Sequence, residues 1–85
     1  MPSLSKGVLM GFQIDLHGKD SIEATAVVEN ALFSLESSDL YDYVDIVVGN
    51  GQGIIRHVAL EIIEEQNFSY DFPNPRQAMI RVYKK

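Results

Sequence analysis

The chain has 85 residues, which is enough for one small domain with its own core but not for two. Hydrophobic residues make up 46% and charged residues 22%, a balance that excludes an intrinsically disordered chain. The absence of cysteine excludes disulfides, thiolate zinc sites and thiol nucleophiles. A net charge of −5 argues against nucleic-acid binding by the surface as a whole.

The distribution of charge leaves room for a local positive site on this acidic protein. The acids gather in two segments that read as helices and in the loop after the first: Glu23, Glu29, Glu36, Asp39, Asp42, Glu61, Glu64 and Glu65. The bases lie elsewhere: Lys19, Arg56, Arg76, Arg81, Lys84 and Lys85.

Residues 1–11 are expected to form a flexible tail and residues 12–85 a single domain. The apolar run after Lys6 is too short for a signal peptide or a membrane span. We therefore expect a cytoplasmic protein.

A first strand is predicted over residues 12–17, where apolar and polar residues alternate. Asp15 and His17 then share the face opposite the core, with Cα atoms about 6–7 Å apart. A carboxylate beside an imidazole suits proton transfer, since imidazole titrates near neutral pH. The alternative is that the solvent face of a strand is simply polar.

Asp20 is predicted to cap a helix, and Glu23 completes a capping box. The helix has an apolar stripe and ends at residues 37–39; the stripe is Ala24, Val27, Val28, Ala31, Leu32 and Leu35. A second strand over residues 43–48 leads into a turn with three glycines, which opens a second helix ending near residues 66–67. The inward stripe of that helix is Ile55, Val58, Ala59 and Ile62.

Two further strands are predicted, over residues 68–72 and 77–83, separated by the turn that Pro73 and Pro75 force. The order β-α-β-α-β-β predicts an α/β protein built as a two-layer α+β sandwich, a mixed four-stranded sheet with both helices on one face. The uncovered face would leave four polar side chains open to solvent: Gln13, Asp15, His17 and Arg81. In this topology, ligands bind at the carboxyl ends of parallel strands.

The turn from Gly49 to Gly53 is suited to anions, because unpaired N–H groups and the helix macrodipole both favour negative charge there. Arg56 adds a guanidinium fork that matches phosphate. The segment lacks the Gly-Lys-Ser/Thr ending of a P-loop and the dinucleotide fingerprint. The alternative is that the glycines only make a tight turn.

Two motifs in this order resemble the Smr (small MutS-related) domain family, over about residues 12–82. The first is Ile14-Asp15-Leu16-His17-Gly18, and the second runs from Val47 through Gly49-Asn50-Gly51-Gln52-Gly53 to Arg56. The resemblance implies a fold similar to the C-terminal domain of translation initiation factor three. It also implies a nucleic-acid endonuclease that nicks DNA or cleaves RNA, by phosphodiester hydrolysis or transesterification, with links to DNA repair and ribosome rescue.

The resemblance assigns catalysis to Asp15 and His17, the acid-base pair. Phosphate or nucleic-acid binding would fall to Gly18, Lys19, Gly49, Asn50, Gly51, Gly53, Arg56 and Arg81. No metal-ligand set is expected and no cofactor is certain, although a divalent metal stays open. One Asp beside one His is short of ligands for a two-metal centre.

Departures from the family pattern favour an alternative. Val48 stands where the family loop has its leading histidine, Asn50 stands where it has lysine, and the Gly-Gly before the last strand is missing. The chain would then be a catalytically weakened module that binds nucleic acid or the ribosome, or the C-terminal domain of a larger MutS-like protein.

Overall fold

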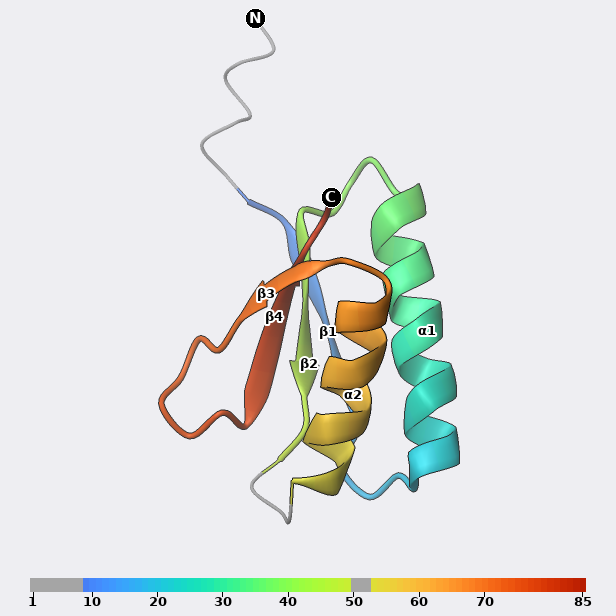
Figure 1. Cartoon of the computed structure of the whole chain (residues 1–85). Coiled ribbons are helices and arrows are strands. Elements are labelled where there is room, and N and C mark those ends of the chain that lie inside the picture. The colour runs from blue at the N-terminus through green and yellow to red at the C-terminus, as the bar shows by residue number, and fades with distance from the viewer. Residues whose placement is uncertain (1–8, 50–52) are drawn as a thin grey trace, which may run out of the picture.

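Two helices lie side by side on one face of a four-stranded sheet (Figure 1). The computed structural model describes residues 9–49 and 53–85. The elements follow in the order β1 (Gly11–Asp15), α1 (Ser21–Ser37), β2 (Tyr43–Val47), α2 (Ile54–Glu65), β3 (Ser69–Asp71) and β4 (Met79–Tyr83). The predicted order and the predicted placement of both helices on one face are confirmed. The predicted tail lies mostly outside the described residues. β1 begins one residue earlier than predicted and ends two residues earlier, so His17 lies in the turn after the strand.

The sheet has the order β1-β2-β4-β3, with β1 and β2 parallel and the other two pairings antiparallel. Because β1 and β2 run in the same direction, their carboxyl ends reach the same edge of the sheet. The helix that follows each strand also begins there, at the lower edge in Figure 1. The amino ends of two helices and two connecting turns are thereby brought to one place.

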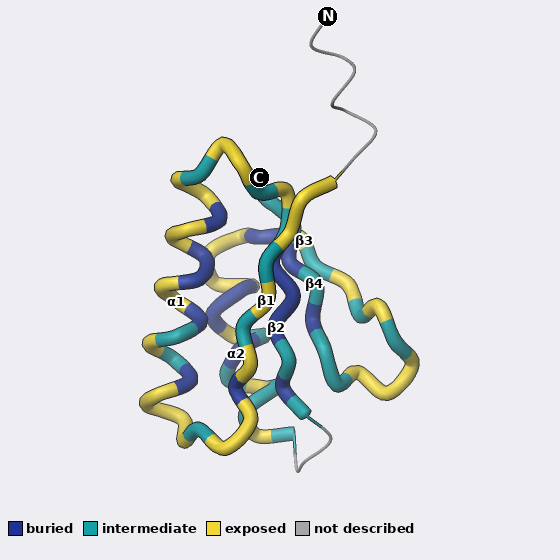
Figure 2. Tube along the Cα trace, turned by 180° about the vertical axis from the view of Figure 1, so that it is seen from behind, coloured by how far each residue is buried: buried dark blue, intermediate teal, exposed yellow. Residues whose placement is uncertain are grey.

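The core lies between the sheet and the helices, and it uses alternate strand residues as predicted. Val44, Ile46, Ile80 and Val82 are fully buried in one cluster with the buried residues of both helices. The dark blue segments of Figure 2 mark this core. The capping box predicted for α1 is present: Glu23 N–H donates to Asp20 Oδ1 (2.8 Å), and Asp20 N–H donates to Glu23 Oε1 (3.1 Å). This box fixes where α1 begins.

The last two strands are shorter than predicted, for backbone reasons. Asn67 adopts a left-handed conformation (φ 62°), so that Phe68 N–H donates to Ile63 O and Asn67 N–H to Glu64 O. This is a Schellman motif, and it makes the buried Phe68 part of the end of α2 rather than the start of β3. Gln77 also has a positive φ (58°), which keeps it out of β4.

The uncovered face of the sheet holds a partly buried ion pair that sequence reasoning missed. Arg81 donates to both oxygens of Asp45, from Nε to Oδ1 at 2.7 Å and from an Nη to Oδ2 at 2.9 Å. Its guanidinium carbon lies 4.3 Å from the centre of the Tyr43 ring. Arg81, predicted to be open to solvent, is therefore only 32% exposed, because Asp45 and Tyr43 hold it against the sheet.

Candidate functional site

The end of β1 and the turn after it carry the predicted acid-base pair, Asp15 on the strand and His17 in the turn. Asp15 and His17 are both exposed, and Leu16 between them is buried. Asp15 Oδ1 accepts a hydrogen bond from His17 N–H (2.8 Å), and Lys19 N–H donates to Leu16 O (3.0 Å). Gly18 has φ +79°, the conformation that such a turn requires of its third residue. The carboxylate thus bonds the backbone of His17 and orders the turn that presents the imidazole to solvent.

The turn after β2 leads into α2 through two glycines with positive φ, Gly49 (80°) and Gly53 (86°). Gly49 N–H donates to Ala78 O, so this amide is already used within the protein. Gly53 is the N-cap of α2 and gives that helix no side-chain cap. The predicted ligands Asn50 and Gly51 lie outside the described residues.

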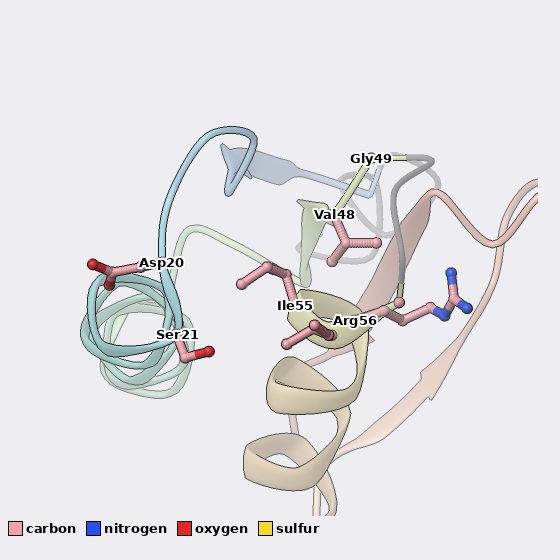
Figure 3. A pocket seen from close by; sticks show the side chains of 8 residues that line it. Asp20, Ser21, Val48, Gly49, Ile55 and Arg56 are labelled. Carbon is pink, nitrogen blue, oxygen red and sulfur yellow. The ribbon is translucent and has the colours of Figure 1, made fainter.

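A pocket of about 290 Å³ lies between the amino ends of the two helices. Its lining residues come from both helix starts and from the end of β2: Asp20, Ser21, Val48, Gly49, Gly53, Ile54, Ile55 and Arg56. In Figure 3, Val48 and Ile55 occupy the middle, Ser21 points from α1 toward α2, and the guanidinium of Arg56 lies beyond the first turn of α2, away from α1. The pocket therefore has an apolar floor and polar ends.

The electrostatics of this pocket favour a small anion. Two helix dipoles point their positive ends at it, and the start of α2 has no carboxylate or hydroxyl cap. Arg56 adds a full positive charge in the first turn. Asp20 opposes this with a negative charge, although its Oδ1 is engaged by Glu23 N–H.

The structure brings some predicted residues together and separates others. Gly49, Gly53 and Arg56 line the pocket. Asp15, His17, Gly18 and Lys19 form the neighbouring turn at the same edge but do not line it. Arg81 lies on the uncovered face with its fork committed to Asp45, a bond that also raises the pKa of Arg81.

Sequence reasoning missed the part of the pocket that the start of α1 supplies. Asp20 was identified only as a cap, and Ser21 was not considered as a lining residue. A signal was present, because parallel strands place the starts of their following helices at one edge of the sheet. This rule places the amino end of α1 next to the glycine turn.

Within residues 9–49 and 53–85, no group of three or more His, Asp or Glu side chains is arranged to hold a metal ion. No helix in the described part of the chain is long and apolar enough to cross a membrane.

Comparison with known proteins identifies the fold. A crystal structure of the human small-MutS related domain superposes with a TM-score of 0.61 and 21% sequence identity, covering 85% of this chain and 99% of the human domain. The fold is that of an Smr domain. At this level of identity the likeness establishes the fold alone. No protein-family model and no curated protein matches the sequence.

The Smr-like fold confirms the resemblance that the two glycine-containing motifs carried and the fold class predicted from the order of the elements. In this fold, both motifs lie in turns at the carboxyl edge of the parallel strand pair.

Proposed function

We propose that this Smr-like domain binds nucleic acid at the carboxyl edge of β1 and β2 and cleaves it there as an endonuclease. The observation that carries the proposal is the pocket where the starts of α1 and α2 meet beside Arg56. A backbone phosphate is the group in nucleic acids that such a pocket suits. Gly53 and Arg56 would hold the phosphate, and Gly18 and Lys19 would contact the strand from the neighbouring turn.

In the proposed reaction, His17 is the general base and Asp15 is its positioning residue. The imidazole takes a proton from a water or a ribose 2′-hydroxyl, and that oxygen attacks phosphorus. The P–O bond to the leaving oxygen breaks as the new bond forms, and the leaving oxygen takes up a proton from solvent water. Asp15 acts through the bond that it accepts from His17 N–H, which fixes the turn.

A second candidate is a domain that binds nucleic acid or the ribosome without cleaving it. Val48 favours this candidate, because its side chain points into the pocket in Figure 3, where the family pattern has histidine. An apolar wall there offers no proton carrier and no hydrogen bond to phosphate. For both candidates we propose a cytoplasmic location. For the second candidate we also propose that the domain is part of a larger MutS-like protein.

The deciding experiment compares binding and cleavage in matched variants. Supercoiled DNA and structured single-stranded RNA are incubated with wild type, His17→Ala and Arg56→Ala, with and without magnesium or manganese. His17→Ala should reduce the cleavage rate by about 10²–10⁴ and keep binding, since a general base contributes that much. Arg56→Ala should weaken binding and lower its salt dependence.

Two outcomes would redirect the proposal. Cleavage that persists unchanged in His17→Ala rules out the assigned base. Binding that depends on Arg56 with no cleavage of either substrate supports the second candidate. His57→Ala is the matched control, because His57 is an exposed histidine on α2 that does not line the pocket.

A further inference from the structure

The outer surface of the helix layer has a groove far from the candidate phosphate pocket. It has a volume of about 470 Å³ and lies beside the C-terminal halves of both helices, lined by Glu29, Leu32, Phe33, Glu36, Ser37 and Gln66. Phe33 is 73% exposed, although its neighbour Leu32 is fully buried. A large aromatic side chain held in water at the wall of a groove is typical of a binding surface.

Acidic side chains predominate on the helix surface around this groove, although Lys85 from the C-terminal end of the chain lies beside Glu36. The two helices carry six exposed glutamates: Glu23, Glu29, Glu36, Glu61, Glu64 and Glu65. Across both helices the only arginine or lysine is Arg56, which lies at the opposite end of α2, in the phosphate pocket. The groove is therefore apolar at Phe33 and negative at its rim, where Glu29 and Glu36 lie.

We infer that this groove is a docking site for a basic amphipathic helix of a partner protein. Leucine-like side chains would pack on Phe33, and flanking lysines or arginines would pair with Glu29 and Glu36. A contact of this kind exists within the chain, where Lys85 Nζ lies 3.8 Å from Glu36 Oε1. A helix seated in a groove through spaced apolar anchors is a common mode of recognition.

Charge selects this occupant over the other plausible ones. Nucleic acid and anionic membranes would be repelled by the row of glutamates. A second copy of the chain would bring the same glutamates against one another, and like charges in contact are unfavourable. A positively charged protein segment gains from both the apolar wall and the acidic rim.

The test uses the full chain and three synthetic peptides. The first is an amphipathic helix with leucines at i, i+3, i+4 and i+7 and lysines on its flanks. The second replaces every lysine with glutamate, and the third is a scramble of the first. Binding is measured by titration calorimetry, and the site is located by backbone amide chemical shifts.

We expect the lysine peptide to shift the amides of Glu29, Phe33 and Gln66. Phe33→Ser should weaken its affinity at least tenfold, whereas Ile22→Ser should change it less than twofold. Ile22 is the matched control, being 82% exposed on the same helix but outside the groove. Glu29→Lys/Glu36→Lys should abolish binding of the lysine peptide and create binding of the glutamate peptide.

The inference is overturned if the scrambled peptide binds as tightly as the amphipathic one, or if Phe33→Ser binds like wild type. It is also overturned if wild type forms a dimer that Phe33→Ser dissolves, because the occupant would then be a second copy. Unfolding curves of the variants should match wild type, since each changed side chain is exposed.

Discussion

The ion pair between Asp45 and Arg81 allows a quantitative test of what stabilises the uncovered face of the sheet. The Asp45 side chain is 12% exposed and the Arg81 side chain 32% exposed, so the two partners differ in access to water. Arg81→Met keeps the aliphatic stem and leaves a nearly buried carboxylate without its two hydrogen bonds. Because an unpaired buried charge is costly, this variant should lose about 2–3 kcal/mol of unfolding free energy.

Asp45→Asn should cost less, about 1 kcal/mol, because the released guanidinium can turn toward solvent. For a domain of this size these losses correspond to Tm decreases of roughly 8–24 °C for Arg81→Met and 4–8 °C for Asp45→Asn. The double variant should recover about 1.5–2 kcal/mol relative to the sum of the single changes, as expected for directly coupled residues.

Urea unfolding of the four proteins at neutral pH measures this cycle. Equal losses in the two single variants, or a coupling below about 0.5 kcal/mol, would refute the reasoning. Nucleic-acid binding is measured on the same variants, and it tests whether Arg81 belongs to the binding site. Arg81→Met should bind like wild type, in contrast to Arg56→Ala, because the Arg81 fork is already held by Asp45.

Two further predictions concern the pocket and the end of α2. Asp20→Asn keeps a good N-cap and removes a negative charge from the pocket, so its affinity for phosphate, measured by amide chemical shifts, should be higher than that of wild type. Asp20→Ala loses the cap and should lower the free energy of unfolding in urea by about 1 kcal/mol. The hydrogen bond that Tyr70 donates to Glu64 raises the pKa of Tyr70, so its contribution to stability is complete below pH 10.0 and is lost as the pH rises through the higher folded pKa. Tyrosinate absorbance in wild type, corrected with Tyr70→Phe, should show a later ionisation that Glu64→Gln moves back toward pH 10.0.

Local patterns were sufficient to predict the order of elements. Alternation in β1 and β2, the stripe of α1 and the capping box at Asp20 each act over a few residues, and the structure has them as expected. The strand order was not local: β4 inserts between β2 and β3, and this alone places Arg81 opposite Asp45. No sequence spacing marks that pairing, since the two residues are 36 positions apart.

The candidate site shows the same division between local and long-range information. Asp15, His17 and the glycine turn were identifiable from sequence, but the amide of Gly49 is used by Ala78, a residue of the approach to β4. The stripe predicted for α1 includes Leu32 and Leu35 and leaves out Phe33, and the structure buries the first two and exposes Phe33. The groove beside Phe33 could not be predicted in this way, because its lining also includes Gln66 from the end of α2.

The acidic net charge and a nucleic-acid partner are compatible once the charges are located. Six glutamates lie along the two helices, and the pocket that we assign to phosphate lies at the helix starts, with Arg56 in its lining. Exposed charges farther apart than about 8–10 Å are largely screened at physiological salt. The glutamates toward the helix ends therefore act weakly on an anion at the edge of the sheet. They also disfavour nucleic acid on the helix surface, which leaves that surface to a partner of opposite charge.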